Sequence, residues 1–198
     1  MKLKLLWIAG ILLPLSLAHP VKAENSTQVQ KLLATKQCPG CDLSGANLKG
    51  ADLGNADLRG ANLKKANLEN ANLFNANLSN ASLESAKLVN ANLFNAILLG
   101  ANLINAELNG SNLSTANLQK ANLSKVDFSD ANLGLTDLTA ANLSNANFSN
   151  ANLMDAKLQG ANLASANFRG ANLSGTSIEK DLLLGINGIN VRSLPHKR

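Results

Sequence analysis

A large apolar residue returns at every fifth position over most of this chain. The series begins at Leu43 and Leu48 and runs to Ile178 without a slip in register, which gives 28 repeats in steps of five from 43 to 178. The residue two positions earlier is small, most often Ala, and the residue between them is most often Asn or Asp. Five residues turn an α-helix by about 500°, so these apolar residues would share no face of a helix. The period therefore excludes a continuous helix.

An extended backbone accommodates the repeat, because residues two apart in a strand point to the same side. In Ala46-Asn47-Leu48 the alanine and leucine would face inward and the asparagine would face water. The next two positions, as in Lys49-Gly50, commonly end in Gly or Asn, which tolerate the positive φ of tight turns. If each turn bends the chain by about a right angle, four repeats close a square coil of about 20 residues. The 28 repeats would then form about seven coils, stacked about 4.8 Å apart in a rod roughly 30 to 35 Å long.

The repeat resembles that of the pentapeptide-repeat family, whose consensus is A(D/N)LxX. Ala46-Asn47-Leu48-Lys49-Gly50 and Ala51-Asp52-Leu53-Gly54-Asn55 carry the resemblance, and in-register repeats cover residues 41–178. The resemblance implies an all-β solenoid, the right-handed quadrilateral β-helix of that family, and the handedness rests on the resemblance alone. Exported members are common in cyanobacteria, so the resemblance also suggests a periplasmic or thylakoid-lumen protein.

The ends of such a column expose its core, so we expect a cap at each end. Residues 24–40 would form the N-terminal cap and junction, with Ser26 beginning a short amphipathic helix that continues over residues 27–34. The apolar side of this helix would consist of Val29, Leu32 and Leu33. Residues 179–198 leave the five-residue period but remain apolar at Leu182-Leu183-Leu184, which predicts a C-terminal cap followed by a charged tail.

Residues 1–23 have the composition of a secretory signal peptide. Two lysines precede an apolar run over residues 5–18, and Val21-Lys22-Ala23 offers small residues for cleavage after position 23. The alternative is a retained membrane anchor, but the run contains Pro14 and is shorter than the roughly 20 residues that span a bilayer. We therefore expect an exported protein with no stable membrane insertion after cleavage.

The charge distribution argues against nucleic-acid binding. The formal net charge of +5 includes three lysines of residues 1–23, and without them 15 basic residues face 13 acidic ones. Residues 41–178 carry nine Lys or Arg and ten Asp or Glu. Such a surface offers neither a basic track for nucleic acid nor the negative field of a DNA mimic. A DNA-mimic regulator of a nucleic-acid enzyme, as in relatives that bind gyrase, is an alternative that export also disfavours.

No catalytic, cofactor or metal site can be assembled from these residues. Leucine and alanine would fill the interior, and the two histidines, His19 and His196, lie in the signal segment and the tail. Several carboxylates take the outward position between Ala and Leu: Asp42, Asp52, Asp57, Asp127 and Asp137. Their stacking is too irregular for a calcium ladder, so we expect them to be solvated or hydrogen-bonded to turns. The sequence thus predicts a protein that is not an enzyme.

Cys38 and Cys41 are the only cysteines and form the motif Cys-Pro-Gly-Cys. In an exported protein we expect a structural disulfide that braces the junction between the cap and the first coil. Two free thiols remain an alternative, since Cys41 takes an inward position where a buried thiol would pack well. A thiol redox protein is a third alternative, but the βαβ context of such enzymes is missing.

Outward apolar residues mark a candidate contact surface. Residues 20 apart should stack, which places Phe74 beside Phe94 and Met154 further along the same row. The remaining members of the predicted cluster are Val89, Ile97, Leu99 and Ile104. A stacked apolar cluster indicates a binding site for a partner or an interface between two copies of the chain. We therefore expect an exported structural or protein-interaction scaffold whose flat faces bind a partner that the sequence does not identify.

Overall fold

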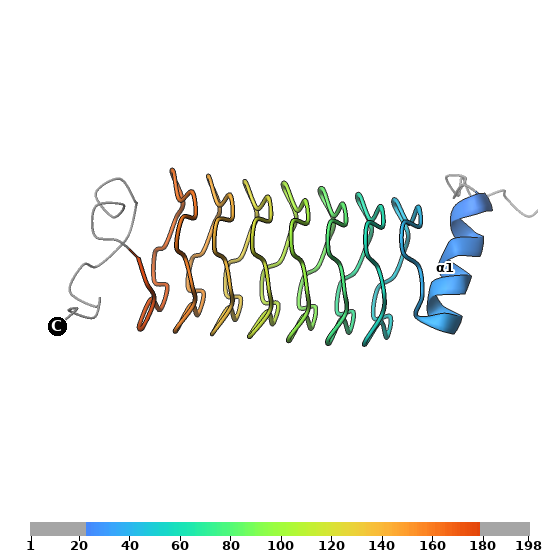
Figure 1. The fold of residues 1–198 in the computed structure, drawn as a ribbon, viewed down its shortest axis with the longest axis horizontal. Coiled ribbons are helices and arrows are strands. Elements are labelled where there is room, and N and C mark those ends of the chain that lie inside the picture. The colour runs from blue at the N-terminus through green and yellow to red at the C-terminus, as the bar shows by residue number, and fades with distance from the viewer. Residues whose placement is uncertain (1–22, 179–198) are drawn as a thin grey trace, which may run out of the picture.

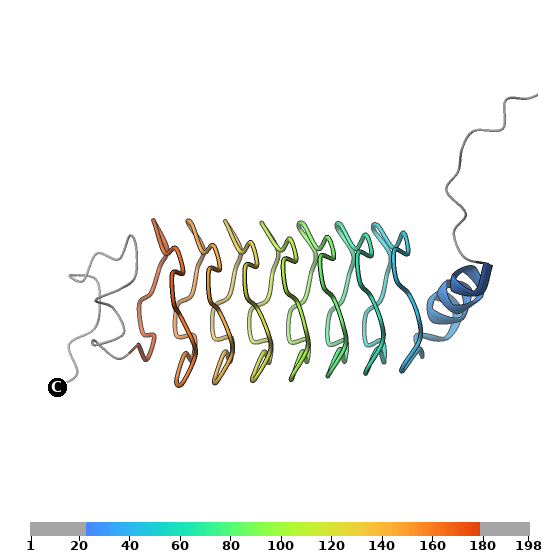
Figure 2. The ribbon, with the colours of Figure 1, turned by 90° about the horizontal axis from the view of Figure 1, so that it is seen from above.

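The computed structural model describes residues 23–178, so all of the predicted signal segment 1–23 except Ala23, and the predicted C-terminal cap at 179–198, lie outside the described residues. One helix, α1 (Ala23–Thr35), precedes a long stack of similar coils (Figure 1). Seen from above, the coils lie in parallel planes along one axis (Figure 2). The described part of the chain is therefore a solenoid with a helix at its N-terminal end.

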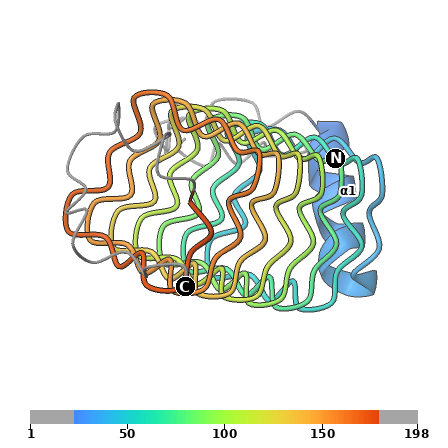
Figure 3. The ribbon, with the colours of Figure 1, turned by 60° about the vertical axis from the view of Figure 1, so that its left-hand side comes forward.

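Backbone hydrogen bonds join residues 20 positions apart, as the five-residue period predicts for a four-repeat coil. Asp42 forms a parallel bridge with Asn62, and Asn62 forms one with Ser82. The Leu43 N–H donates to the Asn62 carbonyl at 2.7 Å, while the Asn62 N–H donates to the Cys41 carbonyl at 2.8 Å. Each bridge is one residue long, because a turn follows after three residues on every side. Figure 3 shows the resulting four-sided outline.

Each turn closes through one tight backbone hydrogen bond, and the turns that follow an outward Asn or Asp add a side-chain bond. At a representative turn, the Ala76 N–H donates to the Leu73 carbonyl at 3.0 Å, and Asn75 has φ of 55°. The Phe74 N–H donates to Oδ1 of Asn72 at 3.2 Å. Asparagine suits both positions, since it tolerates positive φ and its side chain accepts from the backbone two residues onward.

The solenoid has four sides, which we number by the first leucine that each buries. These are side 1 with Leu43, side 2 with Leu48, side 3 with Leu53 and side 4 with Leu58. A corner is named by the two sides that it joins. Alanine and leucine of successive coils form one continuous buried cluster along the axis. The interior is thus filled by side chains from end to end of the described coils.

Helix α1 packs against the first coil through a narrow face. Leu32 is fully buried and Val29 packs partly against the core, whereas Leu33 is 45% exposed. The expectation that Leu33 shares the buried face was wrong, because 100° per residue carries it past the contact centred on Leu32. The helix also begins at Ala23, so Ser26 lies within it and is not the residue that starts it.

The ladder of coils extends one repeat further toward the N-terminus than the leucine series. Gln37 bridges to Asp57, so residues 36–40 form a repeat in which Cys38 takes the leucine position. No leucine marks this repeat, and Lys36 replaces its alanine. The junction expected over 24–40 therefore divides into α1 and a first β-helix repeat.

Side 2 changes its core residue from leucine to phenylalanine in the last three coils. The ring of Phe148 stacks on Phe128 at 5.1 Å and on Phe168 at 4.8 Å between centroids, and all three rings are buried.

We predict that Phe148→Ala lowers the free energy of unfolding by about 3 to 5 kcal/mol, because it leaves a cavity between two rings. The matched exposed change Phe94→Ala should cost about 1 kcal/mol or less. Chemical denaturation followed by circular dichroism measures both, and equal losses would contradict the packing described here.

Candidate interaction surface

The large exposed apolar side chains of the solenoid gather around side 4. Within residues 36–178 they are Phe74, Phe94, Ile97, Leu99, Leu135 and Met154. Ile97 takes the outward position of side 4 itself, and the other five occupy the two corners that border it. We call these six residues the side-4 patch. Such gathering on one side differs from the isolated exposed apolar residues that any protein surface carries.

Corner 3/4 carries most of the patch. The rings of Phe74 and Phe94 stack in successive coils with centroids 5.9 Å apart and planes 5° from parallel. Met154 lies three coils further along the same row. The stacking that the 20-residue spacing predicts for Phe74 and Phe94 is therefore present in the structure. Stacking of this kind stabilises an aromatic pair.

Two residues of the predicted cluster lie elsewhere on the solenoid. Val89 belongs to corner 2/3 and Ile104 to corner 1/2, and both are only partly exposed. They share a coil with parts of the patch, but sharing a coil does not place residues on one side. Leu99 lies on corner 4/1, next to Ile97, and stays within the patch.

Leu135 was missed by the sequence reasoning, although it is the most exposed member of the patch at 59%. It occupies the second turn position with φ of 60°, where the same corner elsewhere carries residues such as Asn75, Thr115 and Asp155. A bulky apolar residue at positive φ is unusual. A leucine at a position that favours Gly or Asn was the signal available in the sequence.

Ion pairs border the patch on side 4. Arg59 binds Asp57 at 2.7 Å, and Lys157 lies 3.7 Å from Asp137. The side-chain hydrogen bond from Arg59 lowers the pKa of Asp57. Burial opposes the ionisation of Asp137, but hydrogen bonds from Thr139 and its other partners still lower its pKa. Both carboxylates are therefore charged at neutral pH. The outward positions of side 4 that lie between these two aspartates carry uncharged residues.

The outward aspartates serve the backbone, as the sequence predicts. Oδ1 of Asp52 accepts from the Gly54 N–H at 3.1 Å and from Nδ2 of Asn72 at 2.9 Å. Asn92 then donates to Asn72 at 3.2 Å, which continues the ladder along side 3. The hydrogen bond from Gly54, followed by those from Asn72 and Lys36, lowers the pKa of Asp52. Among residues 23–178, no group of three His, Cys, Asp or Glu is placed to hold a metal ion.

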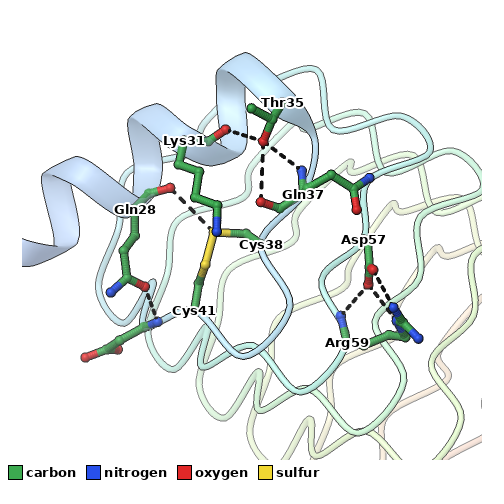
Figure 4. Close-up of a disulfide and its surroundings, with 9 residues drawn as sticks. Gln28, Lys31, Thr35, Gln37, Cys38, Cys41, Asp57 and Arg59 are labelled. Carbon is green, nitrogen blue, oxygen red and sulfur yellow. Dashed lines mark hydrogen bonds and ion pairs between the residues drawn. A yellow bond between two sulfur atoms is a disulfide. The ribbon is translucent and has the colours of Figure 1, made fainter.

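Cys38 and Cys41 form a disulfide beneath α1 (Figure 4). Cys38 is fully buried and Cys41 is 8% exposed. The Gln28 carbonyl oxygen lies 3.5 Å from Sγ of Cys38, and the Gln28 side chain accepts from the Asp42 N–H. The disulfide thus lies between the helix and the first coil. A thiol oxidoreductase needs an accessible sulfur, which this position does not offer.

We predict that the native protein resists reduction at Cys38 and Cys41 by dithiothreitol, because α1 must move before a thiolate can reach either sulfur. Adding denaturant should release both thiols at the rate of unfolding. Mass spectrometry after alkylation counts them under the two conditions. Rapid reduction of the folded protein, together with turnover in an insulin-reduction assay, would contradict the structural role.

The repeats match known family models over residues 41–178. A model described as pentapeptide repeats (8 copies) matches residues 41–80, 61–100 and 76–114, and one described as a pentapeptide repeat region matches residues 101–178. The chain belongs to the pentapeptide-repeat family. Within residues 23–178 of this pentapeptide-repeat protein, no helix combines the length and apolar character needed to cross a membrane.

Solved pentapeptide-repeat proteins of cyanobacteria and plants resemble the chain. HetL, involved in heterocyst differentiation regulation in the cyanobacterium Nostoc sp. strain PCC 7120, is 30% identical over 71% of this chain and 84% of its own, with a TM-score of 0.37. Rfr23 of the cyanobacterium Cyanothece 51142 is 28% identical over 79% and 96%, with a TM-score of 0.24. A protein of the Arabidopsis thaliana thylakoid lumen is 27% identical over 77% and 81%, with a TM-score of 0.20. No curated protein is similar enough to match.

Proposed function

We propose that this pentapeptide-repeat protein is an exported, non-enzymatic scaffold that binds a protein partner through the side-4 patch. The gathering of its exposed apolar side chains on one side and its two bordering corners carries the proposal. The stacked pair Phe74 and Phe94 would be the centre of the contact. Aromatic side chains held in place lose little entropy on binding, so a rigid row of them suits a contact site.

The scaffold would be a right-handed column of seven coils, closed by α1 at one end and by residues 179–198 at the other. Residues 1–23 would direct export and be removed, which places the mature protein in the periplasm or thylakoid lumen of a cyanobacterial-type cell. The composition of that segment supports export. The family match supports the column.

The solenoid interior favours binding over catalysis. Leucine and alanine fill it, so a small molecule finds no room among the described coils. The outward polar groups are engaged in turns and ladders, as Asp52 and Asn72 show. A partner therefore meets a flat surface whose shape is fixed by backbone hydrogen bonds between coils.

The paired change Phe74→Ser and Phe94→Ser tests the proposal. Serine already occupies the same turn position at Ser114, so the fold should persist with unchanged circular dichroism. We predict at least a tenfold loss of the partner recovered by crosslinking and mass spectrometry from the exported fraction, because the central apolar contact is removed.

The matched control is Val89→Ser with Ile104→Ser, which removes apolar side chains from corners 2/3 and 1/2. This control should recover the partner as well as the unchanged protein does. Equal recovery by both paired variants and the unchanged protein would contradict the proposal.

A further inference from the structure

Large and small residues are arranged along corner 3/4 so that two copies of this corner, laid antiparallel, would place each large residue opposite a small one. The first turn position of this corner carries, in six successive coils, Gly54, Phe74, Phe94, Ser114, Gly134 and Met154. We call these six residues the Phe74 row. Phe74, Phe94 and Met154 are exposed, Gly54 and Ser114 are partly exposed, and Gly134 is buried between its neighbours. The row therefore presents two ridges separated by two coils with small residues, and Leu135 stands beside Gly134 at the second turn position of the second of these coils.

Reversing the row places every large residue opposite a small one. Phe74 then faces Gly134, Phe94 faces Ser114, and Met154 faces Gly54. The operation corresponds to a two-fold axis perpendicular to the rod, midway between the levels of Phe94 and Ser114. Shifting the reversed row by one coil in either direction sets a phenylalanine against a phenylalanine or against Met154. Knobs facing depressions are what close packing between two surfaces requires.

The charges of side 4 fit the same reversal. Its outward positions in the same six coils are Asp57, Asn77, Ile97, Asn117, Asp137 and Lys157. The axis that pairs Phe74 with Gly134 sets Asp57 opposite Lys157 and Asp137 opposite Asn77. No two like charges meet at these positions. The side chain of Lys157 is 62% exposed, which leaves it accessible to a second carboxylate.

We propose that the partner of the Phe74 row is a second copy of this chain, bound antiparallel with side 4 against side 4. This inference rests on the proposed function, because it names one occupant of the side-4 patch. The contact is short: six coils about 4.8 Å apart span about 24 Å. Because the contact is confined to one side of the solenoid over this length, we expect a dimer that dissociates reversibly in the micromolar range.

A large residue in place of Gly134 should separate the copies. Gly134 has no positive φ, and an added Cβ would meet Oδ1 of Asn132 at 3.4 Å, which is ordinary contact. Phenylalanine already occupies this turn position at Phe74 and Phe94, so Gly134→Phe should fold. The control Ser124→Phe adds the same ring at the same turn position on corner 1/2.

Sedimentation of the full chain from about 5 to 500 µM gives the dimer dissociation constant. We expect Gly134→Phe to raise it at least tenfold and Ser124→Phe to leave it unchanged. The double variant Phe74→Ser with Gly134→Phe exchanges the large and small members of one pair and should return the constant to within about threefold of the original. A monomeric unchanged protein, equal effects of the two phenylalanine variants, or no recovery in the double variant would overturn the inference.

A zero-length carbodiimide crosslink between Asp57 and Lys157 tests the orientation. Within one chain these residues are five coils, about 24 Å, apart, so the crosslink forms only between copies. Its detection in the dimer fraction supports the antiparallel register, and a dimer without it overturns that register. A monomeric protein that still captures another partner through Phe74 and Phe94 would overturn the dimer and leave the proposed function intact. A dimer of the expected register supports both proposals, with the second copy as the partner, whereas a monomer that captures no protein through this patch overturns both.

Discussion

Hydrogen bonding between residues 20 positions apart is the constraint on which the rest of this structure depends. Each coil donates and accepts through its backbone to the coils above and below, as Leu43, Asn62 and Cys41 show. The coil is this small because most residues facing the axis are Ala and Leu, whose side chains form one continuous buried cluster. Within the described coils the axis is therefore occupied by side chains, and the surfaces that face outward are their sides and corners.

The outward asparagines extend the same constraint to the surface. Each Nδ2 that donates does so toward the preceding coil, and each Oδ1 accepts from the turn of its own coil, as Asn72 does with Asp52 and Phe74. The first residue of a ladder only accepts hydrogen bonds and donates none to an earlier coil. A carboxylate therefore serves at that position as well as an amide. Asp42 and Asp127 begin ladders in this way by accepting from the asparagine 20 residues later. Asp42, Asp52 and Asp127 thus mark where ladders begin, whereas Asp57 and Asp137 form ion pairs.

The sequence predicts the coil well because a period of five permits few geometries. It also predicts that Phe74 and Phe94 stack, since this follows from the 20-residue coil alone. It predicts less well where a residue departs from the repeat. Cys38 holds a leucine position that no leucine marks, and Leu33 lies at the edge of a helix face whose centre depends on docking.

The candidate surface was predicted in part for a related reason. Val89 and Ile104 share a coil with the patch, but the position within the 20-residue coil decides which corner a side chain occupies. Leu135 was missed because it occupies the second turn position, whereas the other patch residues occupy the first turn position or the outward position. Assigning each residue to its corner also shows that the Phe74 row would match a second, antiparallel copy of itself. The five-residue period by itself does not show this match.

Distances along one corner test the coil most directly. Spin labels at Lys65 and Asn145 lie four coils apart on corner 1/2, and labels at Lys65 and Ser165 lie five coils apart. Pulsed electron resonance should give backbone separations of about 19 and 24 Å, a rise of about 4.8 Å for each 20 residues. Separations that do not increase with each added 20 residues would contradict a stacked solenoid and the surfaces inferred from it.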